Sequence, residues 1–113
     1  MARDTLFLLQ PGFADPKRPD GPFICPHCNQ IEGFLASFPE LAKGIDVHRL
    51  PFPRPRQPVI DLVGEDNQGL PLLVLAGTAP DDAKAHGEVR FVSETRRILE
   101  LLSERHGFPK LHS

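Results

Sequence analysis

The chain has 113 residues, of which 40% are hydrophobic and 25% charged, and its formal net charge is −2 at pH 7. This length suits one domain that buries a core without disulfides or metal, and the near-neutral charge argues against nucleic-acid binding, which usually needs a basic face. No apolar run approaches the roughly 20 residues of a membrane-spanning helix, and the N-terminal apolar stretch is too short for a secretory signal. We therefore expect a single cytoplasmic domain over residues 1–113.

The first half of the chain predicts two strands separated by a long loop and a helix. Thr5–Gln10 is a short apolar run closed by Pro11, which is typical of a buried strand. Residues 11–24 hold four prolines and two glycines, so we expect a loop there. Apolar side chains then recur at helical spacing over 26–38, and residues 45–50 alternate apolar and polar side chains as a half-buried strand does.

The second half predicts four further elements. They are a short helix over 58–63, a buried strand over 70–75, an antiparallel edge strand over 89–92 and a helix over 93–106. Residues 76–87, between the two strands, are expected to form a polar surface connection. Ser93 is a good N-cap for the last helix, and Gly107 suits its left-handed C-terminal end. The order β-α-β-α-β-β-α predicts an α/β fold with a four-stranded mixed sheet and helices on both faces.

The chain's two cysteines, Cys25 and Cys28, stand where the long loop becomes the first helix. At the N-cap, Cys25 would direct its sulfur at unpaired backbone N–H groups and the positive end of the helix, which favours the thiolate. Cys28 lies one turn further along, within disulfide reach, and a protonated His27 would add positive charge beside the attacking thiol. One exposed thiol beside a more buried one is what dithiol–disulfide exchange requires.

The C-x-x-C spacing also admits other roles. It is half of a zinc site, which His106, His112 or a second subunit could complete, and the cysteines could equally be buried structural thiols. Their position after a strand and at a helix start favours the redox role, in which Cys25, Cys28 and His27 carry the chemistry. That role requires no cofactor, although glutathione could serve as co-substrate.

Over essentially its whole length the sequence resembles the thioredoxin superfamily. The element order matches, the C-x-x-C motif opens the first helix, and Leu70-Pro71 occupies the place of the superfamily's cis-proline. The resemblance implies a cis peptide at Pro71 packed against the dithiol, and a Leu70 backbone free to pair with a bound peptide or glutathione. The Pro-His pair between the cysteines is similar to that of periplasmic disulfide oxidants, and the overall pattern resembles an uncharacterised bacterial thioredoxin-like family, a domain of unknown function.

The stretch over 70–99 resembles glutaredoxins and the N-terminal domain of glutathione transferases. Residues 94–99 (ETRRIL) are similar to their Glu-Ser-x-x-Ile-Leu helix start, which holds the γ-glutamyl group of glutathione. The resemblance implies that Glu94 and Thr95 contact glutathione. Because the helical C-terminal domain of the transferases has no counterpart in this sequence, we do not expect transferase activity.

These observations predict a thiol–disulfide oxidoreductase, or a redox-responsive protein, that acts on a protein or small-molecule disulfide. The alternative is a non-enzymatic binding module of the same fold whose cysteines hold zinc or only pack, or a glutathione-binding protein. Arg54 and Arg56 could hold an anionic group such as a glutathione carboxylate, but a solvated surface loop is the interpretation we favour for them. Neither nucleic acid nor a membrane is expected as a partner.

Overall fold

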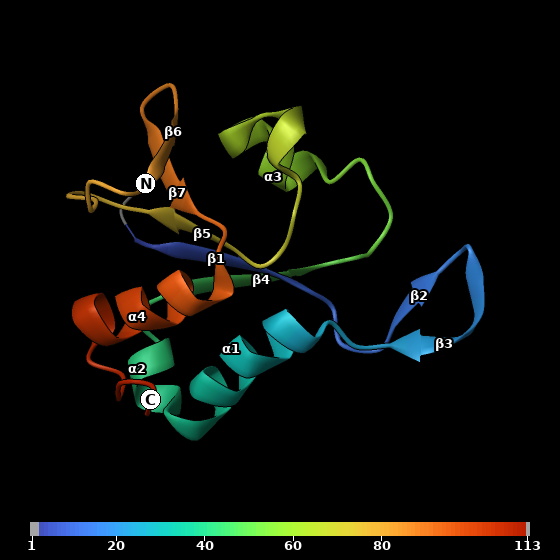
Figure 1. The fold of residues 1–113 in the computed structure, drawn as a ribbon, viewed down its shortest axis with the longest axis horizontal. Coiled ribbons are helices and arrows are strands. Elements are labelled where there is room, and N and C mark those ends of the chain that lie inside the picture. The colour runs from blue at the N-terminus through green and yellow to red at the C-terminus, as the bar shows by residue number, and fades with distance from the viewer. Residues whose placement is uncertain (1–2, 113) are drawn as a thin grey trace.

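The computed structural model describes residues 3–112 and has a mixed α/β architecture around one central sheet (Figure 1). The sheet has five strands in the order β4-β1-β5-β7-β6. β1 runs parallel to β4 and antiparallel to β5, and the β5-β7 and β7-β6 pairs are antiparallel. The strands are β1 (Thr5–Leu9), β4 (Asp46–Leu50), β5 (Leu72–Leu75), β6 (Lys84–His86) and β7 (Val89–Val92).

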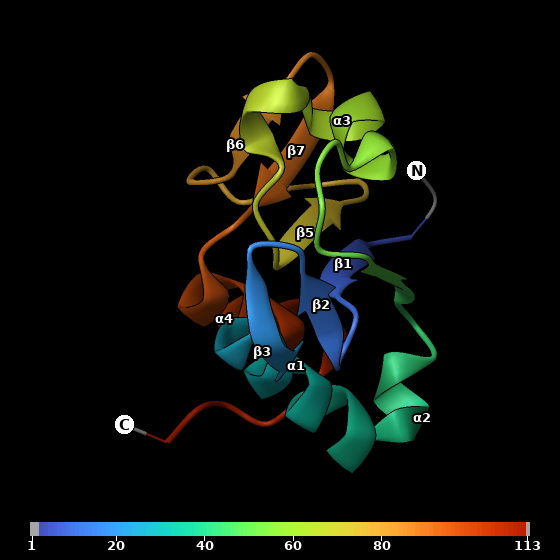
Figure 2. The same cartoon turned by 90° about the vertical axis from the view of Figure 1, so that its right-hand side faces the viewer.

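Helices cover both faces of the sheet (Figures 1 and 2). One face carries α1 (Pro26–Ser37), α2 (Pro39–Ala42) and α4 (Thr95–His106). The opposite face carries α3 (Gln57–Val63), which is followed by a single 3₁₀ turn, Glu65–Asn67. Among residues 3–112, no helix combines the length and the apolar composition that crossing a membrane requires.

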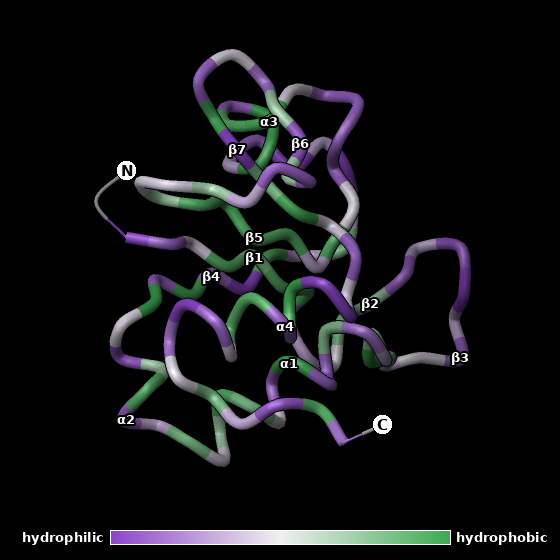
Figure 3. The backbone as a smooth tube through the Cα atoms, turned by 60° about the vertical axis from the view of Figure 1, so that its left-hand side comes forward, coloured by the Kyte–Doolittle hydropathy of each residue, from purple (hydrophilic) through white to green (hydrophobic). Residues whose placement is uncertain are grey.

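The two faces of the sheet bury separate apolar clusters because successive side chains of a strand point to opposite faces. Leu6 and Leu8 of β1 join the cluster under α1 and α4, whereas Phe7 joins Val59 and Val63 under α3. All five residues of β1 are buried, which explains why this strand reads as a continuous apolar run. Figure 3 shows the hydrophobic colour concentrated in the central strands and the hydrophilic colour at the outlying turns.

The prediction of a four-stranded sheet is wrong by one strand. Residues 84–86, which we expected in a surface connection, form β6 and pair with β7 through the backbone. All three residues are exposed, so no apolar pattern in the sequence marks them as a strand. Val89–Val92 is consequently an inner strand between β5 and β6, and the expectation of an edge strand there is also wrong.

The expected loop over 11–24 contains a two-stranded hairpin, β2 (Phe13–Asp15) and β3 (Arg18–Phe23), that projects beyond the start of α1 (Figure 1). The prolines within β3 are tolerated because each strand of a two-stranded hairpin has one unpaired edge. Phe13 stacks on Phe52 with 4.8 Å between ring centroids, which anchors the base of the hairpin to the body of the protein.

Two element boundaries near the expected site differ from the sequence prediction. β5 begins at Leu72, because Pro71 has no backbone N–H to donate to the sheet. The Leu70–Pro71 peptide is cis, as the thioredoxin resemblance implies. The N-cap of α4 is Glu94 rather than Ser93, and its side chain makes no capping hydrogen bond. Gly107 does end α4 in the left-handed conformation, at φ 78°.

Candidate functional site

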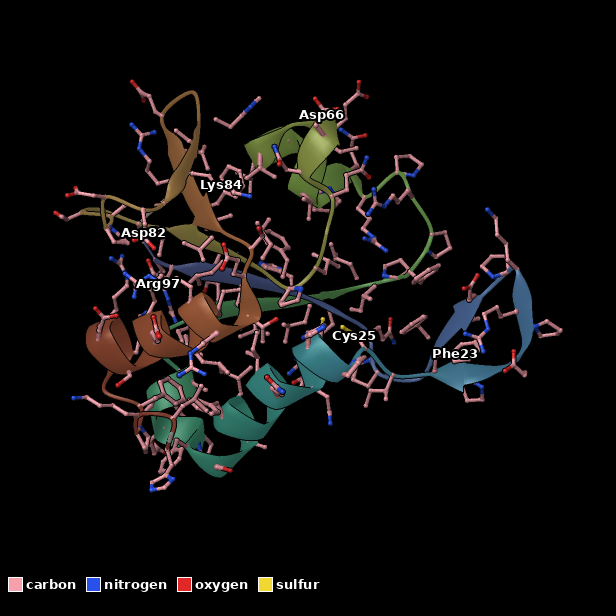
Figure 4. All side chains as sticks on the ribbon, viewed as in Figure 1. Phe23, Cys25, Asp66, Asp82, Lys84 and Arg97 are labelled. Carbon is pink, nitrogen blue, oxygen red and sulfur yellow. The ribbon has the colours of Figure 1, made fainter. Side chains whose placement is uncertain are left out.

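The site begins at Cys25, which is the N-cap of α1 directly after the hairpin (Figure 4). Pro26 fills the first helical position, where its missing N–H removes no helical hydrogen bond. The backbone N–H of Cys28 donates to the Sγ atom of Cys25 at 3.2 Å. The sulfur of Cys25 therefore faces a backbone N–H donor in the first turn of the helix, and the residue is partly exposed.

Cys28 lies one turn along α1 in a different environment. Its side chain is buried, with 2% of the residue exposed, and its Sγ atom accepts a hydrogen bond from the backbone N–H of Leu9 at 3.4 Å. Burial raises the pKa of Cys28 to about 12, and the Cys25 sulfur and the Glu32 carboxylate also raise it, against the lowering effect of the Leu9 N–H. Both thiols are free.

A groove of about 920 Å³ extends from the first turn of α1 to the start of α4. Five of the residues that the sequence singled out lie along it: His27, Leu70, Pro71, Glu94 and Thr95. Residues from three distant parts of the chain therefore line one surface. Neither cysteine lines this groove, but His27, which stands between them in the chain, does, so the groove reaches the turn of α1 that carries the dithiol.

Arg56 has an environment that our interpretation of the sequence did not foresee. It lies in the segment that joins β4 to α3 and is only 7% exposed, so the expectation of a solvated charge is wrong for this residue. Its guanidinium donates to the backbone carbonyl oxygens of Phe52 and Gln68, the latter from Nη1 at 2.7 Å. Burial and the charge of Arg54 lower the pKa of Arg56, whereas the cysteine sulfurs raise it.

The sequence does hold one signal for Arg56. The residue is the N-cap of α3, where a positive charge meets the positive end of the helix dipole and is disfavoured. A residue type that contradicts its local element is one mark of a functional position. That contradiction becomes visible only once the start of α3 is placed accurately.

The histidines proposed as additional zinc ligands have other surroundings. Nε2 of His106 lies 2.7 Å from Oδ2 of Asp4, and His112 is one of the residues that line the groove. Within residues 3–112, no group of three or more His, Cys, Asp or Glu side chains is arranged to hold a metal ion. A zinc ion on Cys25 and Cys28 would therefore need ligands from outside this part of the chain.

Comparison with known proteins identifies a family and no individual relative. A family model described as "Protein of unknown function (DUF3088)" matches residues 3–110, a span that includes the dithiol, Arg56 and every residue lining the groove except Leu111 and His112. No curated protein and no solved structure matches the chain. Since the family model covers nearly the whole sequence, the chain belongs to the DUF3088 family of proteins of unknown function.

Proposed function

We propose that this protein is a thiol–disulfide oxidoreductase of thioredoxin-like fold, with Cys25 as the nucleophile and Cys28 as the resolving thiol. The observation that carries the proposal is the asymmetry of the two thiols. Cys25 is partly exposed and its sulfur receives an N–H hydrogen bond at a helix start, whereas Cys28 is buried with a pKa raised to about 12 by that burial. An accessible thiol that reacts first, next to a protected one that reacts second, is the arrangement that exchange chemistry uses.

The architecture supports a thioredoxin-like fold. Without the projecting hairpin, the four-residue α2, the 3₁₀ turn and β6, the elements are β1, α1, β4, α3, β5, β7 and α4, which is the expected β-α-β-α-β-β-α order. The dithiol opens the first helix after β1, and the cis peptide before Pro71 lies in the groove beside it. In this interpretation β6 and the β2–β3 hairpin are additions to the shared framework.

The proposed reaction has two steps. The Cys25 thiolate attacks one sulfur of a substrate disulfide, which forms a mixed disulfide and releases the other substrate sulfur as a thiolate that takes up a proton. Cys28 then loses its proton and attacks the Sγ atom of Cys25, which forms the Cys25–Cys28 disulfide and releases the second substrate thiol. The substrate gains two electrons and two protons, and the protein dithiol is oxidised; the reverse sequence oxidises a substrate dithiol.

The first step prepares Cys28 for the second. Both the hydrogen bond to the Cys25 sulfur and the negative charge of that sulfur raise the pKa of Cys28 in the reduced protein. Once Cys25 is part of a neutral mixed disulfide, its negative charge is gone, while the Leu9 N–H still favours a Cys28 thiolate. Cys28 is therefore least acidic before the substrate is bound and becomes more acidic when its attack is needed.

The groove suggests glutathione or a disulfide-bonded peptide as the substrate class. Glutathione carries a γ-glutamyl ammonium group and two carboxylates, and Glu94 offers a carboxylate for the ammonium. Thr95 and the first N–H groups of α4 offer donors for the adjacent carboxylate. These groups lie in the same groove as Pro71 and His27, so a ligand held by them would extend toward the dithiol.

The proposal is tested by incubating the reduced protein with glutathione disulfide, quenching with acid and counting thiols by mass. The wild-type protein is expected to form an intramolecular disulfide reversibly between about −270 and −120 mV, the range of catalytic dithiols. Cys28→Ser should stop at the mixed disulfide with glutathione, because the resolving thiol is absent. Cys25→Ser is the matched control, and it should form neither product while the protein remains folded.

Two outcomes would reject the proposal. In the first, both wild-type thiols stay free across the whole range of potentials. In the second, Cys25→Ser and Cys28→Ser form the mixed disulfide equally fast, since the accessibility of Cys25 then has no role. Metal content of protein purified without chelator tests the zinc alternative directly, because a stoichiometric ion on both cysteines would prevent exchange.

A further inference from the structure

Arg56 differs from the other arginines of the protein in what surrounds its charge. Arg49, Arg97 and Arg105 are each partly exposed, and each forms an ion pair with a carboxylate. Arg56 is more deeply buried, yet within residues 3–112 it forms no ion pair with any carboxylate. A buried cation without a counter-charge is costly, so its retention calls for a negative partner that is present in one state of the protein.

The protein holds the Arg56 side chain in one place. Its Nε and Nη2 atoms donate to the carbonyl oxygen of Phe52 and its Nη1 atom donates to that of Gln68, while its backbone N–H donates to Oε1 of Gln68 at 2.7 Å. The guanidinium also lies 5.6 Å from the centroid of the Phe52 ring. These contacts fix the position of the charge, but neutral carbonyl groups do not balance it.

The fixed charge lies at the dithiol end of the molecule. Phe52, whose carbonyl oxygen accepts from Arg56, and Leu70, two residues after Gln68, both pack against the apolar cluster that contains Cys28, and Cys25 packs against the same cluster. The segment between β4 and α3 leaves the sheet at the same end at which α1 begins (Figure 1). In agreement with this placement, negative charge on either cysteine raises the pKa of Arg56.

We propose that Arg56 is the fixed counter-charge of the reduced dithiol: its buried guanidinium stabilises the Cys25 thiolate and thereby favours the reduced form over the disulfide. This role rests on the proposed exchange function. The disulfide reacts with two molecules of glutathione to give one Cys25 thiolate, one Cys28 thiol, one proton and glutathione disulfide. The negative charge appears only on the reduced side, so a nearby cation stabilises that side alone. Arg56 therefore acts as a positioning residue that sets the redox equilibrium.

The test compares the equilibrium constant for this reaction in glutathione buffers among four proteins: the wild type, R56M, R56K and R54M. Removing the charge in R56M should shift the constant about tenfold toward the disulfide, which is about 30 mV for a two-electron couple. R56K keeps a positive charge and should stay within about threefold of the wild type. Arg54 is exposed in the same segment, so R54M is the matched control and should stay within about twofold.

The outcomes separate this inference from the proposed function. If the wild-type protein never forms the disulfide, the proposed function fails and this role falls with it. If the wild type forms the disulfide reversibly and folded R56M has the same equilibrium constant within about twofold, Arg56 only holds the segment between β4 and α3 in place and the inference alone is overturned. If R56M does not fold, R56K decides: a constant close to that of the wild type supports a charge effect, and a loss as large as about tenfold shows that the guanidinium geometry matters instead.

Discussion

A charged side chain is buried at each end of β1, and the two differ in whether an opposite charge lies next to them. At the start of the strand, Asp4 is 4% exposed and receives hydrogen bonds from Arg105, from the backbone N–H of Ala76 and from His106. At the far end, Arg56 is buried, and the acceptors of its guanidinium among residues 3–112 are the backbone carbonyl oxygens of Phe52 and Gln68. The charge of Asp4 is neutralised by Arg105, and we call this the balanced end of β1. The charge of Arg56 has no carboxylate partner among residues 3–112.

This difference separates a structural role from a functional one. The Asp4 cluster ties the first strand to the C-terminal end of α4, two segments about 100 positions apart in sequence, and its charges cancel in place. The charge of Arg56 cancels only if negative charge appears on a neighbouring sulfur, which happens when the dithiol is reduced and ionised. We therefore expect substitutions at the Asp4 end to change stability and substitutions at the dithiol end to change reactivity.

The largest expected effect is the protection of Cys28. With a pKa of about 12 caused chiefly by burial, instead of the ordinary 9.0, Cys28 has a thiolate fraction at pH 8 about a thousandfold lower than in the unfolded chain. Iodoacetamide should therefore modify Cys25 in the native protein while Cys28 reacts about a thousandfold more slowly than it does in urea. Initial rates at each site, read by peptide mass spectrometry, provide the measurement.

The same experiment has a clear negative result. If Cys28 of the native protein reacts within about tenfold of its rate in urea, the two thiols are equivalent and the asymmetry behind the exchange mechanism is absent. A urea titration of the alkylated protein serves as the control, since it shows whether the modification itself has unfolded the chain.

The next largest effect should come from Arg105→Met at the balanced end. This change leaves the Asp4 carboxylate buried with fewer donors, and breaking a buried ion pair in this way typically costs about 3 kcal/mol or more. Urea denaturation should show the loss as a lower midpoint with an unchanged slope. The matched control is Arg96→Met on the same helix, where an exposed ion pair at 3.8 Å is worth less than about 1 kcal/mol.

The dithiol chemistry of Arg105→Met provides the contrast. Its equilibrium with glutathione should match that of the wild type within about twofold, because Arg105 has its ion-pair partner in Asp4 at the opposite end of β1. A redox shift in Arg105→Met as large as that of R56M would remove the distinction between the two ends.

The sequence predicted the framework and much of the site for identifiable reasons. Buried strands such as β1 carry an apolar run, and the cysteine spacing at a helix start carries its own chemistry. β6 could not be predicted because its three exposed residues are held by backbone pairing alone. Periodicity and spacing could not bring Leu70 and Glu94 into one groove either, since these residues come together only through the order of the strands; the resemblance to glutathione-binding proteins supplied that expectation.

The burial of Arg56 could not be predicted for a different reason. Arginine next to proline in a polar segment is typical of a solvated loop, and nothing in the local sequence states that the side chain turns inward. Its burial depends on carbonyl groups of Phe52 and Gln68, the second of which is twelve positions away across α3. Contacts of this kind belong to the tertiary fold and leave no periodic pattern in the chain.

A smaller effect is expected from pH at the balanced end. Burial acts to raise the pKa of Asp4, but hydrogen bonds from Arg105, the Ala76 N–H and His106 outweigh it and hold the pKa below the usual value of 3.8. A lowered folded-state pKa stabilises the protein above the unfolded-state value and loses that contribution as pH falls through the folded-state value. The free energy of unfolding from urea titrations should therefore decrease below about pH 4.

Asp4→Asn identifies the source of that dependence. The variant should be less stable at neutral pH, because a neutral amide attracts Arg105 less strongly, and its stability should change less between about pH 5 and pH 3. If wild-type protein and Asp4→Asn lose stability in parallel as the pH falls, other carboxylates cause the acid sensitivity and the Asp4 cluster is not the main contributor.

The smallest expected effect is on the alkylation rate of Cys28 when the ion pair between Glu32 and Arg49 is altered. Glu32 raises the pKa of Cys28 through its negative charge, while Arg49 binds that carboxylate through two hydrogen bonds of 2.6 and 2.7 Å. Glu32→Gln should therefore increase the alkylation rate of Cys28 about twofold, and Arg49→Met should decrease it by a similar factor because the Glu32 charge is then less neutralised. Opposite shifts from the two partners of one ion pair would show an electrostatic effect, whereas local loosening of α1 would accelerate Cys28 in both variants. Because this pair is already balanced, its effect on reactivity should remain well below that of Arg56, whose charge has no carboxylate partner among residues 3–112.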